Sequence, residues 1–210
     1  MRYDVDRLNQ QHGIWFEDLV RAKNGCLGIP RIDGPFDVPG VYNKDGGLNV
    51  SVKTVRKTTT GRIASVGLAS APRFAAINED YQLIVGIHTP VNDGKLFGEV
   101  RTYEVTKKFH KKLLGGLTAE LLLQFDAMIK AHRRSERGDV LARDYALKTR
   151  ELLLTKYGNR PLVELAYKIN GDNRRLQLQV DLEHLAPALS RVDTTNYRGT
   201  RLPLFYSPGA

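Results

Sequence analysis

The sequence predicts an α/β fold, in which a mixed central sheet is flanked by helices. Apolar residues recur at helical spacing near the N-terminus, polar and apolar residues alternate over residues 48–54, and residues 81–89 form an apolar run. The first pattern is typical of an amphipathic helix, the second of a half-buried strand and the third of a central strand. Both kinds of element in a chain of 210 residues predict one α/β core with a sizeable added part.

The first elements carry the residues that matter most below. An apolar stripe predicts a helix over residues 4–24, ended by Gly25 and Gly28. Turn residues then lead to a short extended run, Phe36-Asp37-Val38. In the strand that follows, alternation places Leu48, Val50 and Val52 on one face and Asn49, Ser51 and Lys53 on the other.

The same rules give the remaining elements. We expect a helix over residues 69–78, strands over 81–89 and 96–105 and, after a cationic run at 107–112, helices over 117–134 and 139–157. Two apolar runs around Gly171-Asp172-Asn173 predict a hairpin, followed by a short helix and an irregular tail. Because the pattern changes after Thr106, we divide the chain into a core, residues 1–106, and a helical and hairpin elaboration packed on it, residues 107–210.

The charge of the chain favours a polyanionic partner. The formal net charge is +9, more than solubility requires, and nucleic acid is the commonest polyanion. Cys26 is the single cysteine, which excludes a disulfide framework and a cysteine-based zinc site. The first residues carry charges where a secretory signal would be apolar, and no apolar run reaches the length of a membrane span. We therefore expect a cytoplasmic protein with no membrane partner and no small-molecule cofactor.

Asp37, Ser51 and Lys53 form the pattern on which the functional hypothesis depends. Hydrolysis of a phosphodiester at neutral pH uses a cation that neutralises developing charge and activates water. Mg²⁺ takes oxygen ligands, commonly one or two carboxylates with water and phosphate, and a nearby lysine can position or deprotonate the water. Asp37 on one strand, with Ser51 and Lys53 on the next, would bring these groups together.

These residues resemble the motif of the PD-(D/E)XK nuclease superfamily. The resemblance is carried by Phe36-Asp37-Val38-Pro39-Gly40 and by Ser51-Val52-Lys53. It is also carried by the upstream segment Gly13-Ile14-Trp15-Phe16-Glu17-Asp18-Leu19-Val20, which is similar to the first helix of archaeal Holliday junction resolvases. The resemblance implies a restriction-endonuclease-like fold with its catalytic core in residues 1–106, Asp37 and Glu17 as Mg²⁺ ligands, and catalytic roles for Asp37, Lys53, Glu17 and Ser51.

Two positions depart from the family pattern. Phe36 stands where the motif has proline, and Ser51 replaces the acidic residue before the lysine. A hydroxyl is a weaker Mg²⁺ ligand than a carboxylate, and the resemblance implies that a glutamate from a nearby helix restores the charge, with Glu17 the first candidate and Glu79 the second. The structural alternatives are that Asp37 braces the Val-Pro-Gly turn, that Lys53 is a solvated strand lysine, and that Glu17 is the polar side of a helix.

Basic residues outside the motif are candidates for contacts with DNA phosphates. They follow Lys53 directly, form the cationic run or lie in the hairpin: Arg56, Lys57, Arg62, Lys107, Lys108, Arg174 and Arg175. A β-ribbon can enter the major groove and read base edges, and the hairpin would offer Asn173, Arg175, Gln177 and Gln179 for this purpose. The elaboration would then serve DNA recognition or dimerisation.

The resulting hypothesis is a Mg²⁺-dependent type II restriction endonuclease that cuts double-stranded DNA as a homodimer. Two alternatives stay open. One is a structure-selective nuclease resembling a Holliday junction resolvase, and the other, suggested by Ser51, is a non-catalytic DNA-binding protein on a degenerate nuclease fold. An RNA-associated protein is disfavoured because the sequence has no aromatic-rich RNA-recognition motif.

Overall fold

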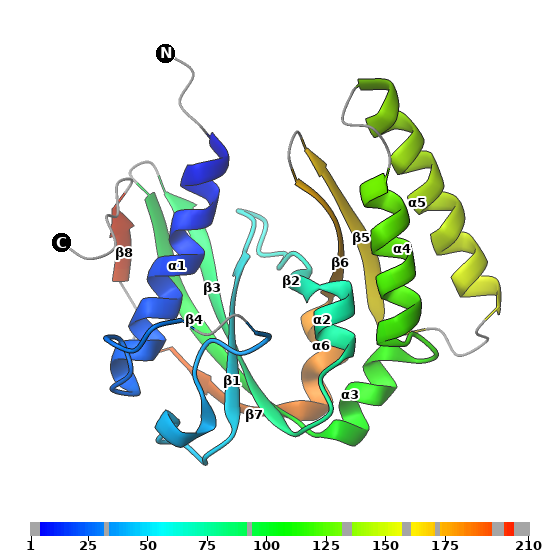
Figure 1. Cartoon of the computed structure of the whole chain (residues 1–210). Helices are drawn as coiled ribbons and strands as arrows, with labels where there is room; N and C mark the ends of the chain where they lie inside the picture. The colour runs from blue at the N-terminus through cyan, green and yellow to red at the C-terminus, as the bar shows by residue number, and fades with distance from the viewer. Residues whose placement is uncertain are drawn as a thin grey trace. The chain divides into compact units, whose positions relative to one another are not determined.

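The computed structural model describes residues 5–31, 34–91, 94–131, 136–156, 161–170, 173–194 and 200–203 (Figure 1). The chain divides into two compact units. The first unit takes residues 1–66, 80–106 and 185–210, and the second takes residues 67–79 and 107–184. The boundary that we expected at residue 106 is therefore one of several, since residues 67–79 belong with the elaboration and residues 185–210 with the core.

The first unit is built on a five-stranded mixed sheet. Strand β1 runs parallel to β3, and β4 is antiparallel to β3, β7 and β8. The strands are β1 (Asn49–Arg56), β3 (Tyr81–Val91), β4 (Gly94–Val105), β7 (Leu189–Asp193) and β8 (Thr200–Pro203). This arrangement confirms the predicted α/β class with a mixed sheet.

The predicted irregular tail is wrong for the residues that the structure describes there. β7 pairs with β4 between Val100 and Tyr103, and β8 pairs with β4 between Gly94 and Phe97. The side chains of β7 are mostly exposed. This strand therefore lacks the apolar alternation by which a strand is recognised in a sequence.

Helix α1 (Val5–Lys23) lies across one face of the first unit's sheet (Figure 1) and confirms the predicted N-terminal helix. Beyond its last turn, the N–H of Cys26 donates to the carbonyl of Arg21 at 3.0 Å, and the N–H of Gly25 donates to the carbonyl of Ala22 at 3.0 Å. Gly25 has a φ of 72°. These features make a Schellman motif, whose left-handed position favours glycine.

Aromatic packing sets the distance between α1 and the sheet. Phe16 is fully buried and stacks on Phe97, with ring centroids 5.1 Å apart and planes inclined by 4°. Gly86 of β3 lies against the same ring, since a Cβ at this position would be 2.7 Å from Phe16. The surrounding core adds Val20, Cys26, Val38, Val50, Val52 and Val100. Because Glu17 follows Phe16, this packing also positions Glu17 beside β1.

The extended run at residues 36–38 is not a full strand. Val38 forms an isolated antiparallel bridge with Val50, and the chain turns after Pro39 into the 3₁₀ helix η1 (Gly40–Tyr42). Pro39 has no N–H to donate to a ladder, so the pairing ends after one bridge. We expected Asp37 and Lys53 to lie on two adjacent strands. Lys53 does lie on a strand, β1, but Asp37 lies in a loop next to the single Val38–Val50 bridge.

The second unit contains a three-stranded sheet of order β2-β6-β5 and helices α2 to α6. β5 and β6 form the predicted hairpin, and its turn residues Gly171 and Asp172 lie outside the described residues. The strands are β2 (Val66–Ser70), β5 (Val163–Asn170) and β6 (Asn173–Val180). The helices are α2 (Ala71–Ala75), α3 (Lys107–Leu114), α4 (Ala119–Ala131), α5 (Glu136–Lys156) and α6 (Leu182–Leu185). The 3₁₀ helix η2 (Ala186–Ala188) follows α6 and belongs to the first unit.

Two local predictions change in this part of the chain. The helix expected over residues 69–78 is a strand to Ser70 and a helix only over Ala71–Ala75, because Pro72 suits the first turn of a helix and the preceding residues pair in the sheet. The cationic run forms helix α3. None of the described helices combines the length and hydropathy needed to cross a bilayer.

The contact between Gly86 and Phe16 predicts the effect of Gly86→Ala on stability. The added methyl group must displace a buried, stacked ring, so we expect the free energy of unfolding to fall by about 1–3 kcal/mol. Gly98→Ala is the matched control, because Gly98 of β4 is exposed and a Cβ there meets nothing within 4 Å. Chemical denaturation measures both variants, and equal stabilities would contradict the close packing.

Candidate active site

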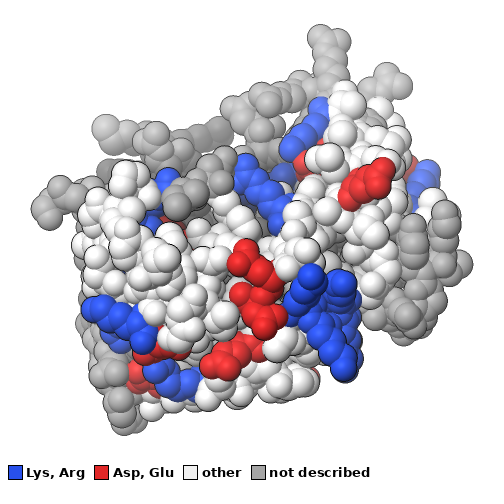
Figure 2. Space-filling model, turned by 60° about the horizontal axis from the view of Figure 1, so that its bottom comes forward, with Lys and Arg blue, Asp and Glu red and all other residues white. Residues whose placement is uncertain are grey.

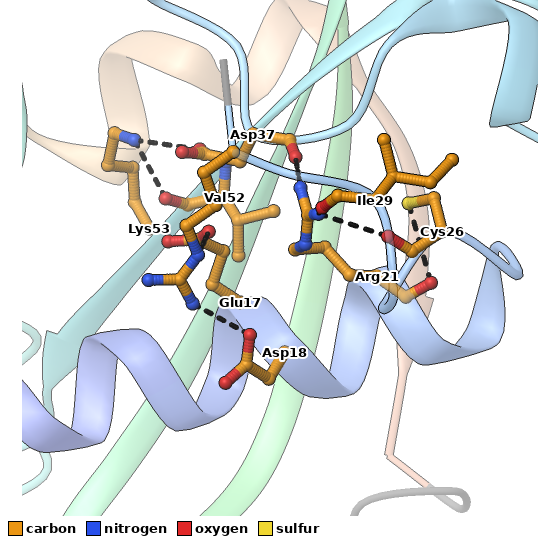
Figure 3. A network of polar contacts seen from close by, with 9 residues as sticks. Glu17, Asp18, Arg21, Cys26, Ile29, Asp37, Val52 and Lys53 are labelled. Carbon is orange, nitrogen blue, oxygen red and sulfur yellow. Dashed lines mark hydrogen bonds and ion pairs between the residues drawn. The ribbon is translucent and has the colours of Figure 1, made fainter. Parts of the chain in front are cut away.

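The free edge of β1 is where the predicted site residues meet (Figure 3). The N–H of Val50 donates to Val38 at 2.8 Å, so the N–H and carbonyl of Val50 point away from β3, and those of Val52 do so too. The Val52 N–H donates to Oδ2 of Asp37 at 2.6 Å. The Asp37 carboxylate therefore takes the place that a strand carbonyl would have one step beyond the Val38–Val50 bridge.

Lys53 approaches the same edge. Its Nζ lies 3.3 Å from Oδ2 of Asp37 and donates to the carbonyl of Val52 at 2.7 Å. The side chains are 19% exposed for Lys53 and 23% exposed for Asp37, so this ion pair is partly shielded from water. Asp37 and Lys53 thus satisfy both backbone groups of Val52 at the edge, which is a structural role beside any catalytic one.

Glu17 reaches this edge from α1. Its side chain is 18% exposed, and Nε of Arg31 lies 2.9 Å from its Oε1. Nη2 of Arg31 also lies 2.7 Å from Oδ1 of Asp18. Arg31, which follows the end of α1, therefore places a cation among the acidic side chains of this site.

The electrostatic surroundings of Glu17 include Asp37 and Arg31. Burial first, and then the negative charge of Asp37, raises the pKa of the Glu17 carboxyl above its ordinary value, while Arg31 acts in the opposite direction. Partial burial opposes ionisation of Arg31, yet its hydrogen bond to Asp18 and the charges of Glu17, Asp18 and Asp37 raise the pKa of its guanidinium overall. Glu17 and Asp37 form a repelling pair of carboxylates that a nearby cation stabilises.

A buried arginine holds the loop that carries Asp37. Arg21 is 3% exposed, and its guanidinium donates to the carbonyls of Asp37 at 2.7 Å and Cys26 at 3.0 Å. It also donates to the carbonyl of Ile29. A charged donor shared by three carbonyls ties this loop to the last turn of α1 (Figure 3).

The remaining predicted active-site residues lie differently. Ser51 is buried in β1 at 6% exposure, and the hydrogen bonds described for the Asp37 carboxylate go to Val52 and Lys53 and not to Ser51. Glu79 is exposed and belongs to the second unit, whereas Glu17 and Asp37 belong to the first. Of the two candidate glutamates, Glu17 is the one that the fold of the first unit brings to Asp37.

Two of these residues offer carboxylate oxygens of the kind that Mg²⁺ binds. Within the described part of the chain, no three His, Cys, Asp or Glu side chains form a ready cluster. Glu17 and Asp37 supply two carboxylates, which is the number that Mg²⁺ commonly takes from a protein before water and phosphate complete its shell. Their mutual repulsion is a second reason for the fit, because a divalent cation between them would lower the pKa of Glu17.

The basic residues predicted to contact DNA are mostly exposed. Arg56, Arg62 and Arg175 are exposed and Lys57 is half-buried, and Lys107 and Lys108 stand exposed on α3 with Lys111 and Lys112. Figure 2 shows a dense group of basic side chains where Figure 1 has α3. The side chain of Arg174 lies outside the described residues.

One predicted base-reading residue is buried. Gln177 is 9% exposed, and a Cβ at Gly67 would be 2.4 Å from its Nε2. The amide therefore packs over β2 within the small sheet and cannot reach a DNA groove in this conformation. Gln179 is half-buried. The backbone of Asn173 is described in β6, and its side chain is not.

Sequence reasoning missed Arg21 and Arg31. Arg21 occupies the end of an amphipathic stripe, where an arginine is ordinarily exposed, and its burial depends on three carbonyls of a loop. Arg31 follows a proline in a turn, and nothing in its surroundings marks it as a partner of α1. Comparison of the chain with family models, curated proteins and solved structures gave no match.

The proximity of the charged side chains predicts opposite shifts in the pKa of Glu17. In Asp37→Asn the pKa of Glu17 falls, because the neighbouring negative charge is lost while an amide oxygen still accepts from Val52. In Arg31→Gln the pKa of Glu17 rises, because a compensating cation is lost. Carboxyl ¹³C NMR titration measures the shifts, with the exposed Lys23→Gln as control. A Glu17 titration unchanged in both variants would contradict the placement.

Proposed function

We propose that the chain is a Mg²⁺-dependent endonuclease that hydrolyses double-stranded DNA, of the type II restriction class. The observation that carries this proposal is the meeting of Glu17, Asp37 and Lys53 at the free edge of β1. They come from a helix, a loop and a strand that are separate in the sequence. Two carboxylates beside an ammonium group suit a metal-assisted phosphodiester hydrolysis.

Each residue has a distinct role in this proposal. The carboxylates of Glu17 and Asp37 would hold Mg²⁺, which supplies charge neutralisation and an acidified water when bound. Lys53 would orient the attacking water from its position 3.3 Å from Oδ2 of Asp37. Arg21 is a positioning residue, because it acts on the backbone of Asp37 at 2.7 Å and not on the reacting groups.

Arg31 supports the proposal from the electrostatic side. It pairs with Glu17 at 2.9 Å and lies close enough to Asp37 for the two charges to interact. Its side chain is 45% exposed, so it can withdraw at low cost in buried area. We expect it to stabilise the carboxylates until a divalent cation takes over this role, and then to remain available for a substrate phosphate.

The raised pKa of Glu17 predicts how the affinity for a metal ion falls at acidic pH. A proton and a cation compete for this carboxylate, so the affinity for the cation declines once the pH falls below the raised pKa that Glu17 has without metal. Cleavage should therefore decline at a higher pH than the ordinary pKa of glutamate, about 4.3, would give.

Ser51 favours a second candidate function, DNA binding without cleavage. This residue stands where the family pattern has a carboxylate, and it is buried at 6% exposure. Without a third acidic ligand, the pairs Glu17–Arg31 and Asp37–Lys53 could remain closed as structural ion pairs. This candidate predicts salt-sensitive binding of duplex DNA with no cleavage in Mg²⁺ or Mn²⁺.

Plasmid cleavage in Mg²⁺ separates these functions. We expect discrete bands from the wild type, and a loss of rate on the order of 10²–10⁴-fold in Asp37→Asn and in Lys53→Met. Asp37→Asn keeps an acceptor for the Val52 N–H, so its loss of activity reports charge and not folding. The controls are Asp45→Asn and Lys44→Met, two exposed residues of the turn before β1.

The pattern of products tests the finer assignment. Cleavage only of four-way junctions would replace the restriction class with a junction-resolving one, and binding with no cleavage of either substrate would favour the non-catalytic candidate. Full activity in either Asp37→Asn or Lys53→Met would overturn the site. Cleavage of both strands at one position, with a dimer in sedimentation, is the result expected for a symmetric restriction enzyme.

A further inference from the structure

A pocket of the first unit lies at the C-terminal end of β1. It has a volume of about 460 Å³, and its lining includes Thr54, Arg56, Ser65, His88 and Lys95. The register of the sheet brings these residues together, since Arg56 is aligned with His88 between β1 and β3, and Pro90 with Lys95 between β3 and β4. The pairing of these strands therefore determines where the lining residues of the pocket lie.

The turn after β1 completes the wall. The Lys57 N–H donates to the carbonyl of His88 at 2.8 Å, and the Ala64 N–H donates to the carbonyl of Arg56 at 3.0 Å. Lys57 and Ile63 form an isolated antiparallel bridge, which closes the turn between them. These bonds hold Ser65 near the end of β1, and Ser65 and Thr54 both line the pocket.

The charge of the pocket is positive. Arg56 and Lys95 both line it, and the described lining residues include no Asp or Glu. Burial first, and then the positive charge of Arg56, lowers the pKa of the Lys95 ammonium. The fold therefore brings two like charges close together at this pocket, and a bound anion would be attracted by both.

The chemistry of the lining identifies the class of anion. The residues that line this volume include an arginine, a lysine, a serine and a threonine. Their guanidinium, ammonium and hydroxyl groups are donors of the kind that suits the tetrahedral oxygens of a phosphate group. A carboxylate has fewer oxygens to satisfy them. His88 is buried at 4% exposure and its ring packs against Phe97 at 5.4 Å between centroids, so it forms a rigid wall.

The pocket lies on the same side of β1 as α1. Thr54 Oγ1 is 4.0 Å from the position that a Cβ at Gly13 would take, and Glu17 is one helical turn further along α1. Lys53 lies three residues before Arg56 on β1 and starts from the opposite face of the strand, because side chains alternate between faces. Its Nζ returns to the edge of the strand, where it donates to the Val52 carbonyl at 2.7 Å.

We propose that this pocket binds a phosphate oxyanion through Arg56 and Lys95, and that a backbone phosphate of DNA occupies it when the scissile phosphate is at Lys53. The second part of this inference rests on the proposed endonuclease function. The first part does not, because a free phosphate group presents the same oxygens. In this proposal the phosphate is the specific partner of Arg56. Lys95 also contacts DNA, although no pattern in the sequence around it predicts such a contact.

Titration with inorganic phosphate tests the first part. We expect phosphate to shift the amide NMR resonances of Thr54, Arg56 and Ser65, with a dissociation constant raised about tenfold or more in Arg56→Gln and in Lys95→Gln, since each removes a charged donor. Lys95→Arg keeps the charge and should retain binding, which separates lost chemistry from lost folding. Lys44→Gln is the control. The absence of shifts in the pocket would overturn the proposal, and shifts unchanged in both Gln variants would do the same.

Binding of a DNA duplex in EDTA tests the second part. We expect Lys95→Gln to weaken binding and to reduce the slope of log K against log salt by about one, while Lys44→Gln leaves the slope unchanged. Phosphate binding with an unchanged DNA slope would support the oxyanion pocket, assign it to a free phosphate group and overturn the DNA part. Both binding results without plasmid cleavage would support the pocket while the proposed nuclease activity fails.

Discussion

The hydrogen bond between the Val52 N–H and the Asp37 carboxylate, 2.6 Å long, is the interaction on which the candidate active site depends. β1 is paired with β3 on one side only, and its other edge would present unsatisfied backbone groups. Val38 covers one step of that edge, and Asp37 covers the next. This requirement holds the carboxylate beside Lys53 even without a ligand. Arg21 stabilises this arrangement because its guanidinium donates hydrogen bonds to three loop carbonyls.

The second constraint is the height of α1 above the sheet. Phe16 rests on Gly86 and stacks on Phe97. The helix therefore lies so close to the sheet that burial and then the charge of Asp37 raise the pKa of the Glu17 carboxyl. Two carboxylates and an ammonium group then share a small, partly shielded region. Structural stability and the proposed chemistry use the same residues here, because the ion pair at the strand edge also keeps Lys53 close to Asp37, one of the two proposed metal ligands.

The sequence predicted the elements with strong periodicity and missed those whose partners are distant. The α1 stripe, the apolar β3 and the alternating β1 were recognisable, and the resemblance led to Glu17, Asp37 and Lys53, which do lie together. Strand β7 was not predicted because its side chains are mostly exposed and show no apolar alternation. Strand β2 was not predicted because the nearby Pro72 indicated only a helix. Arg31 and the burial of Gln177 could not be predicted, since each depends on contacts between segments that no local pattern records.

Anomalous diffraction from crystals soaked in Mn²⁺ tests the central claim most directly, because it locates a divalent cation without relying on activity. We expect one peak between the carboxylates of Glu17 and Asp37, with Arg31 withdrawn from Glu17, and no peak there in Asp37→Asn. A map without density at this position, with the Glu17–Arg31 and Asp37–Lys53 pairs intact at high Mn²⁺ concentration, would contradict the account. The edge of β1 would then hold a structural ion-pair network and not a metal centre.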